Sequence, residues 1–225
     1  MVIETNLRSI LEELPSDVKL VAVSKFHPVP ELLEAYQAGQ RCFGENRPQE
    51  FSMKAVQLPQ DIEWHFIGHL QTNKLKMVLP YASLVQSIDS RHLLDLVDNW
   101  GRTNGKVISI LLELHLGAEE TKGGFTQEEI ESLLEEYVNA EPGTLFAGIR
   151  FCGLMGIASH TEDEEIIDAD FARIEAFKKH LEERFPQLTD FKELSIGMSG
   201  DWKIALRHGA TIIRVGTAIF GPRVY

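Results

Sequence analysis

The stretch "KLVAVSKFHPVPELLEAYQAG", residues 19–39, joins a short apolar run to a helical pattern. The run KLVAV is rich in β-branched and small apolar residues, which favours a buried strand. In the second half, Pro30 near the start and Gly39 after the end bound a helix. A strand followed directly by a helix is half of a parallel βαβ unit. The stretch therefore predicts one such unit, with Lys25 at the carboxyl end of its strand.

The same alternation continues to the end of the chain. Seven further β-type runs follow, in "RCFGEN", "EWHFIGH", "ASLVQSID", "GKVISILLELHL", "LFAGIRFCGLMGIA", "FKELSIGM" and "ATIIRVGTAIFG". Helical patterns separate them, and one of these begins with a capping box formed by Thr126 and Glu129. Another helix precedes the first strand, with apolar residues at intervals of three and four: Ile3, Leu7, Ile10, Leu11 and Leu14.

Eight β-type runs that alternate with helices predict an α/β protein. We expect a single (β/α)8 TIM-type barrel domain over residues 1–225, with an extra N-terminal helix. An open, doubly wound parallel sheet is the alternative. The count of eight, with no linker-like segment between the runs, favours the barrel.

Composition limits the classes of partner. The chain has 22 Lys and Arg against 34 Asp and Glu, a formal net charge of −12, which disfavours a nucleic-acid-binding surface. The two cysteines, Cys42 and Cys152, have neither disulfide-framework nor zinc-knuckle spacing. The first residues do not resemble a signal peptide, and no apolar run is long enough to span a membrane. These features predict a cytoplasmic protein with reduced thiols, and the lack of an obvious apolar seam predicts a monomer.

The ends of the seventh and eighth strands carry residues suited to a phosphate. In barrels of this kind the active residues cluster at the carboxyl ends of the strands, and phosphates often sit at the last two loops. "GMSGDW" places Ser199 where a helix N-cap is expected, and Gly216 and Thr217 follow the eighth strand. Backbone N–H groups and hydroxyls there would form a phosphate cup. Either motif alone is better explained as a helix cap or a turn, and only the two together, at the paired loops, favour a phosphate site.

Two basic residues should point into the barrel. Lys25 shares the side-chain parity of Val21 and Val23, and Arg214 shares that of Ile212. A desolvated lysine amine can attack a carbonyl, and an arginine can only donate hydrogen bonds. Together with a phosphate cup, these residues favour pyridoxal 5′-phosphate (PLP), which offers an aldehyde, a phosphate and a ring nitrogen. The alternatives are a lysine that extends to solvent and an arginine in a structural ion pair.

The histidines and the loop after the fifth strand are weaker indications of a site. His65 and His69 are four residues apart, which is a metal-ligand spacing only on a helix, whereas here the context is a strand. A packing or hydrogen-bonding role is therefore predicted, and no metal. The loop "GAEETKGG" is expected to be solvated, and Gly123 and Gly124 could serve as hinges of a lid.

Six ordered blocks strongly resemble the pyridoxal phosphate homeostasis protein family, which is similar to the N-terminal barrel of alanine racemase. The blocks are "VAVSKFHP", "FGENRPQE", "WHFIGHLQTNK", "GLMGIA", "LSIGMSGDW" and "IIRVGTAIFG". The resemblance implies that Lys25 holds PLP as a Schiff base, and that Arg214 faces the ring nitrogen. It further implies roles in phosphate binding or in lining the pocket for Ser199, Gly216, Thr217, Asn46, Met155, His65 and Met198.

This chain departs from the family pattern at two places near the expected site. Phe26 and His27 follow the lysine where the family often has threonine and lysine, and Arg47 stands where the second block often has tyrosine. Neither departure is expected to touch the Schiff base, but both could change what reaches the mouth of the pocket.

The resemblance implies a carrier more than an enzyme. Alanine racemases have a second domain that supplies a tyrosine, whereas this sequence ends soon after the eighth strand and has no tyrosine suited to act as a second base. We therefore expect a non-enzymatic PLP-binding protein that buffers the cofactor or delivers it to PLP-dependent apo-enzymes. The alternatives are a PLP-dependent enzyme such as a weak amino-acid racemase, and a cofactor-free Schiff-base aldolase.

Overall fold

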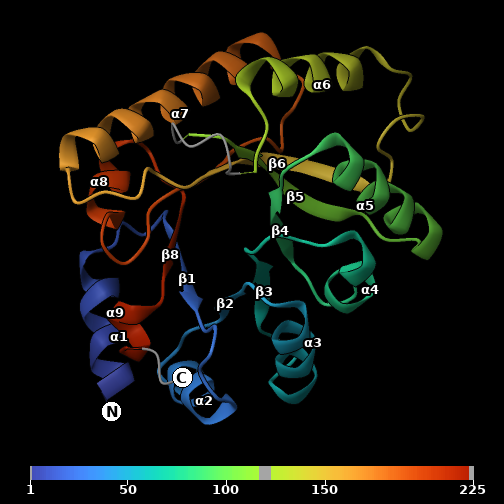
Figure 1. Cartoon of the computed structure of the whole chain (residues 1–225). Coiled ribbons are helices and arrows are strands. Elements are labelled where there is room, and N and C mark those ends of the chain that lie inside the picture. The colour runs from blue at the N-terminus through green and yellow to red at the C-terminus, as the bar shows by residue number, and fades with distance from the viewer. Residues whose placement is uncertain (1, 117–122, 223–225) are drawn as a thin grey trace.

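The eight predicted strands form a closed parallel barrel in the computed structural model, which describes residues 2–116 and 123–222. Each strand pairs with the next along the chain, and β8 pairs with β1 (Figure 1). The strands are β1 (Lys19–Val23), β2 (Cys42–Glu45), β3 (Glu63–Phe66), β4 (Leu84–Ile88), β5 (Ile108–Leu114), β6 (Ile149–Gly156), β7 (Glu193–Ser195) and β8 (Ile212–Val215). The predicted barrel is confirmed, and the open sheet is excluded.

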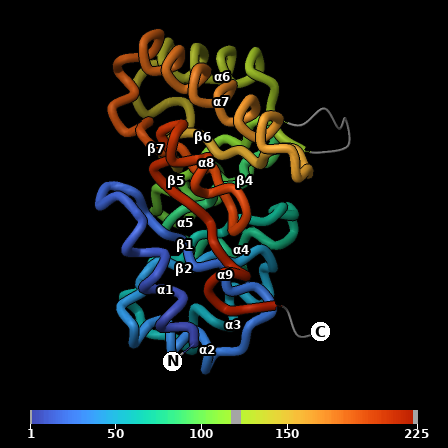
Figure 2. The backbone as a smooth tube through the Cα atoms, turned by 90° about the vertical axis from the view of Figure 1, so that its left-hand side faces the viewer, coloured from blue at the N-terminus to red at the C-terminus, as the bar shows by residue number. Residues whose placement is uncertain are grey.

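Helices surround the barrel between successive strands (Figures 1 and 2). They are α2 (Val29–Gln37), α3 (Pro48–Gln57), the short pair η1 (Thr72–Lys74) and α4 (Leu75–Val78), α5 (Arg91–Asn104), α6 (Gln127–Asn139), α7 (Glu164–Arg184), α8 (Trp202–Arg207) and α9 (Thr217–Phe220). The extra helix α1 (Val2–Glu13) lies beside α9, and the Asn6 side chain donates a hydrogen bond to the Ile219 carbonyl at 3.0 Å. The predicted N-terminal helix is confirmed.

The local signals for helix boundaries hold at most positions. Helix α2 has Pro30 in its first turn, and α6 has the complete capping box between Thr126 and Glu129. The predicted N-cap at Ser199 is wrong, because α8 begins at Trp202 with Asp201 before it. The Met198 carbonyl accepts from the N–H groups of Asp201 and Trp202, at 3.2 and 3.0 Å, so a turn occupies this segment before the helix starts.

Apolar side chains fill two regions, one between the sheet and the helices and one inside the barrel. The inner set comprises Val21, Val23, Cys42, Leu84, Leu111, Met155 and Ile212. Because side chains alternate across a strand, Arg214 of β8 shares the inward face of Ile212. Lys25 lies in the turn two residues beyond β1, and both basic residues line the cavity at the carboxyl ends of the strands. The predicted inward direction of both basic residues is therefore confirmed.

Three remaining predictions concern the state of the cysteines, the loop after β5 and membrane-spanning segments. Both cysteines are unpaired, Cys42 buried and Cys152 partly buried. Residues 117–122 of the predicted lid loop lie outside the described residues, whereas Gly124 is described and has a φ of +121°. Among the described helices, none is both long and apolar enough to span a bilayer.

A β-bulge in β6 depends on one glycine. The register of β5 against β6 shifts between Ile110 and Leu111, which pair with Phe151 and Gly153. Gly153 has a φ of +148°, and a Cβ atom built on it would lie 1.9 Å from the Glu193 carbonyl oxygen of β7. A side chain is therefore excluded by both backbone conformation and contact.

We predict that Gly153→Ala lowers the free energy of unfolding by roughly 2–5 kcal/mol, since it adds a steric overlap to an unfavourable φ. Gly209→Ala is the matched control, because Gly209 has a φ of +70° and open space around its Cα. The control should cost only about 1–2 kcal/mol. Urea denaturation of both variants measures the difference, and equal losses would contradict the steric argument.

Candidate functional site

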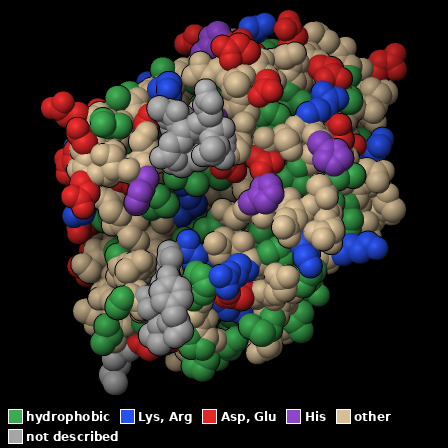
Figure 3. All heavy atoms as spheres, in the orientation of Figure 1, with side chains coloured by type: hydrophobic (Ala, Val, Ile, Leu, Met, Phe, Trp, Pro, Cys, Tyr) green, Lys and Arg blue, Asp and Glu red, His purple; other side chains and the backbone are tan. Residues whose placement is uncertain are grey.

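A cavity of about 490 Å³ opens at the carboxyl ends of the strands. It brings together seven of the nine predicted site residues: Lys25, Asn46, Met198, Ser199, Arg214, Gly216 and Thr217. The space-filling view shows a hollow near the centre of this face, with basic, acidic and histidine side chains around it (Figure 3). The strand ends therefore converge on one site, as the barrel topology requires.

The loops after β7 and β8 meet on one side of the cavity. The Gly216 N–H donates to Ser199 Oγ at 3.2 Å, and Thr217 follows directly as the first residue of α9. A Cβ atom on Gly216 would lie 3.0 Å from the Val23 carbonyl oxygen, so the absence of a side chain lets β8 approach β1 closely here. Hydroxyl and backbone N–H donors are thus gathered at the cavity wall, which suits an anion.

Arg214 is held in a fixed position at the base of the cavity. Its guanidinium donates to the Ser195 carbonyl at 2.7 Å, to Ser195 Oγ at 2.6 Å and to the Gly156 carbonyl at 2.9 Å. Burial lowers the pKa of Arg214 to about 10, while Asp201 and Glu113 act against that change. The group stays protonated at neutral pH, so it remains a hydrogen-bond donor. Its hydrogen bonds go to neutral oxygens, which disfavours the alternative of a structural ion pair.

A chain of hydrogen bonds continues from Arg214 down the barrel interior. Ser195 Oγ lies 2.6 Å from Gln86 Oε1, and Gln86 Nε2 lies 2.8 Å from His65 Nδ1. Because arginine can only donate, Ser195 accepts from Arg214 and donates to Gln86, whose amide then donates to His65. His65 is therefore a support at the far end of this chain and does not line the cavity.

Met155 also lies outside the cavity lining. It is 1% exposed and packs in the inner apolar set beneath the site. It fills the barrel interior, as inward-facing residues of TIM-type barrels do.

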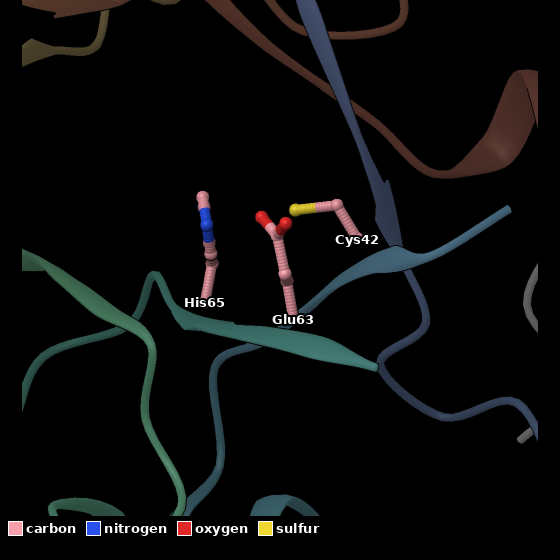
Figure 4. Close-up of side chains that lie close together, drawn as sticks. All are labelled: Cys42, Glu63 and His65. Carbon is pink, nitrogen blue, oxygen red and sulfur yellow. The ribbon is translucent and has the colours of Figure 1, made fainter. Parts of the chain in front are cut away.

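One group of potential metal ligands occurs among the described residues: Cys42, Glu63 and His65, whose ligand atoms all lie within 4.8 Å of one another (Figure 4). Two contacts and the burial of one thiol oppose a metal there. Lys19 Nζ bonds Glu63 Oε2 at 2.5 Å, burial raises the pKa of the Cys42 thiol, and the Gln86 amide leaves the His65 proton on Nε2. Burial also lowers the pKa of His65 to about 3, so the ring is neutral. The contacts favour the predicted hydrogen-bonding role.

Three acid–base side chains at the cavity were not predicted as part of a site. Asp89 Oδ2 pairs with His69 Nδ1 at 2.8 Å, and Glu113 lies on the wall near them. Burial and, to a smaller extent, the Asp89 charge raise the pKa of Glu113 to about 7, against the opposing charges of Arg214 and His69. A charged residue at an inward position of the apolar run "ISILLEL" was the available signal for Glu113.

The two departures from the family pattern contact each other. The Arg47 guanidinium lies over the Phe26 ring, 4.1 Å from its centroid. Phe26 has a φ of +69°, which is uncommon for a bulky residue. The departures therefore form one cation–π pair that joins the loops after β1 and β2 beside Lys25.

Comparison with known proteins agrees with this geometry. The family described as "Alanine racemase, N-terminal domain" matches residues 2–224. A pyridoxal phosphate homeostasis protein from Aquifex aeolicus is 37% identical over 208 residues, 92% of this chain and 88% of that protein. One from Vibrio alginolyticus is 38% identical over 216 residues, 94% of this chain and 89% of that protein. The chain belongs to the pyridoxal phosphate homeostasis protein family, within the alanine racemase N-terminal domain class, as the sequence blocks predicted.

A solved structure is also similar to this chain over nearly its full length. PipY of Synechococcus elongatus PCC7942, solved with PLP bound, superimposes with a TM-score of 0.88 at 36% identity, covering 97% of this chain and all of that one. The likeness extends over the whole barrel, including the strand ends that form the cavity.

We predict that Glu113 makes stability fall as pH rises. The carboxyl titrates near 4.5 in the unfolded chain and near 7 in the folded protein, so the folded state binds more protons between these values. The resulting loss amounts to roughly 3 kcal/mol and is complete above the folded pKa. Glu113→Gln should remove this component, as measured by urea denaturation at pH 5 and pH 8. A variant with the same pH dependence as the parent would contradict the assignment.

Proposed function

We propose that this protein binds pyridoxal 5′-phosphate in the cavity and holds it as a Schiff base on Lys25, without catalysing a reaction of its own. One observation supports the proposal most: a lysine, a donor-rich loop pair and a fixed arginine line the same cavity. The PLP bound in PipY and the names of the relatives point the same way. We further propose a role in intracellular PLP homeostasis, by buffering or delivery of the cofactor.

The residues at the cavity fit the three reactive parts of PLP. The Gly216 N–H and the hydroxyls of Ser199 and Thr217 would bind the phosphate, and the permanently protonated Arg214 would face the ring nitrogen. The Lys25 amine would condense with the aldehyde and release one water molecule. The bound cofactor supplies a reactive carbonyl, and the protein supplies position and desolvation.

Asn46 provides an independent sign that a ligand belongs here. Its Oδ1 atom is buried and has no hydrogen-bond partner among the described residues. A buried acceptor without a partner costs free energy, which a donor on a bound molecule would recover. Since Asn46 and Lys25 line the same cavity, a hydroxyl donor on bound PLP would satisfy this oxygen.

The other polar groups favour a carrier over a racemase. The described tyrosines lie away from the cavity: Tyr36 bonds Asp61 at 2.8 Å, Tyr137 packs on Phe151, and Tyr81 is 41% exposed. A racemase needs a proton donor or acceptor on each face of its substrate. An arginine at the ring nitrogen also disfavours ring protonation by like-charge repulsion, which weakens the electron sink.

A PLP-dependent enzyme, such as a weak amino-acid racemase, is the second candidate. The observation in its favour is that His69, Asp89 and Glu113 line the cavity, where a carrier does not require acid–base groups.

For the carrier we propose a cytoplasmic monomer whose partners are PLP and, on delivery, PLP-dependent apo-enzymes.

We predict that the purified protein with PLP absorbs in the visible range, and that borohydride reduction fixes the label on Lys25. Lys25→Ala should lose the covalent link and keep its cooperative thermal unfolding, because the change removes one desolvated amine from the cavity wall. Lys203→Ala is the control, since Lys203 is surface-exposed and paired with Glu13. Absorption spectra and peptide mapping measure the result.

Other outcomes of the same experiment have defined meanings. Label on another lysine would refute the proposed link to Lys25. A protein that stays colourless after PLP is added, with Lys25 unmodified, would favour the Schiff-base aldolase. Turnover of either amino-acid enantiomer at the rate of dedicated enzymes, lost in Lys25→Ala, would replace the carrier by the enzyme.

Ser199→Ala should weaken PLP binding about 10- to 150-fold, because a hydrogen bond to a charged group contributes roughly 1.5–3 kcal/mol. The Gly216 N–H that Ser199 accepts from would lose its partner at the same time. Titration of absorbance with PLP gives the affinity of parent and variant. Equal affinities would remove Ser199 from the phosphate site.

A further inference from the structure

The turn that carries Lys25 rests on a buried ionic cluster contributed by α3. Lys54 is 1% exposed, although it is a lysine in the middle of a helix. Its ammonium donates to Glu45 Oε1 at 2.6 Å, to the Ser24 carbonyl at 2.9 Å and to Glu50 Oε2 at 3.1 Å. All three donors of the ammonium are therefore used. A charge buried to this extent is rare without such partners.

The cluster holds both peptide groups that flank Lys25. On the N-terminal side, Lys54 binds the Ser24 carbonyl, which belongs to the peptide that joins Ser24 to Lys25. On the C-terminal side, Glu50 Oε2 accepts from the Phe26 N–H at 3.0 Å, which belongs to the peptide that joins Lys25 to Phe26. The Lys54–Glu50 ion pair links these two anchors. The orientation of the backbone at Lys25 is thereby fixed from both sides.

The pKa values of the two carboxyl groups, Glu45 and Glu50, shift in opposite directions because their surroundings differ. Burial raises the pKa of Glu45, and the Lys54 charge with the hydrogen bonds from Lys54 and Ser24 opposes this. Burial would likewise raise the pKa of Glu50, but the Phe26 N–H and Lys54 outweigh it and lower that pKa below its ordinary value. Glu50 is therefore an anion at neutral pH and a strong acceptor for the Phe26 amide.

The cluster also maintains an unfavourable backbone conformation next to the lysine. Phe26 has a φ of +69°, which persists only where the surroundings over-determine it. Glu50 holds its N–H from the buried side, and Arg47 covers its ring and lies 3.6 Å from Glu50 Oε1. Residues of α3, with Arg47 directly before that helix, thus hold the turn together with the His27 N–H, which donates to the Ser24 carbonyl at 3.0 Å.

We propose that Lys54 and Glu50 are positioning residues that orient Lys25 for its bond to the cofactor aldehyde. This rests on the proposed function, because it assigns Lys54 and Glu50 to the same site. Neither residue lines the cavity, so they act through the peptide groups on each side of Lys25. A displaced reactive group loses much of the advantage of its fixed orientation.

Two ligands separate orientation of Lys25 from binding in general. PLP forms the covalent link, whereas pyridoxine 5′-phosphate carries the same ring and phosphate with an alcohol in place of the aldehyde. The ratio of their affinities therefore measures the contribution of Lys25. We expect the preference for PLP to fall about tenfold in Glu50→Gln, with pyridoxine 5′-phosphate affinity unchanged within about twofold.

The set of variants allows for the possibility that Lys54→Met alone does not fold, since it leaves Glu45 buried without a counter-charge. The double variant Lys54→Met/Glu45→Gln removes both charges and keeps an acceptor for Ser24 Oγ. It should show the same loss of PLP preference as Glu50→Gln. Asp98→Asn is the matched control, because Asp98 is also a buried carboxylate that accepts a backbone N–H, from Gly148 at 2.7 Å, away from the cavity.

Hydrogen exchange of the protein without cofactor provides the second readout. The Phe26 amide should exchange faster in Glu50→Gln and in the double variant, and at the parent rate in Asp98→Asn. An unchanged affinity ratio in folded variants, or equal losses for both ligands, would overturn the positioning role. If the parent binds neither ligand, or Lys25→Ala leaves the ratio unchanged, the proposed function fails instead, and the exchange rates alone then decide whether the cluster holds the turn.

Discussion

The pairing of β1 with β8 is the contact on which the rest of this structure depends. Four residues of β1, from Lys19 to Ala22, lie opposite the four residues of β8, from Ile212 to Val215. This pairing closes the barrel, and it brings the loop with Lys25 beside the loop with Gly216 and Thr217. A lysine near one end of the chain and an anion site near the other become neighbours only through it. The close approach of Gly216 to the Val23 carbonyl shows how little space the closure leaves.

Much of the fold followed from periodicity and from residues that bound helices. Eight apolar runs, separated by helical patterns, were enough to predict the closed barrel. Strand parity then gave the inward direction of Lys25 and Arg214, because alternation is a local property of a strand. Ser199 was assigned to the cavity wall although its role as an N-cap was wrong, since a loop can deliver a side chain to the correct place with a different backbone conformation.

Other parts of the site depend on contacts between distant segments, which no local pattern contains. Glu113 and Asp89 come from different strand ends, and only the closed barrel brings them near His69 and Arg214. No pattern in the sequence marks Lys54, because its burial results from the packing of α3 against the ends of β1 and β2. His65 was placed at the cavity by resemblance, whereas its position on β3 puts it lower in the barrel, within reach of Gln86.

The hydrogen bonds in the chain from Arg214 to His65 all run in one donor-to-acceptor direction through the barrel interior. The guanidinium has no acceptor, so it fixes which way Ser195 points its hydroxyl, which way the Gln86 amide turns and which ring nitrogen of His65 carries the proton. The position of Arg214 at the base of the cavity therefore determines the tautomer of His65, which does not line the cavity. The nitrogen NMR signals of that buried imidazole would report whether the arginine keeps its place, and they would do so without any probe in the site.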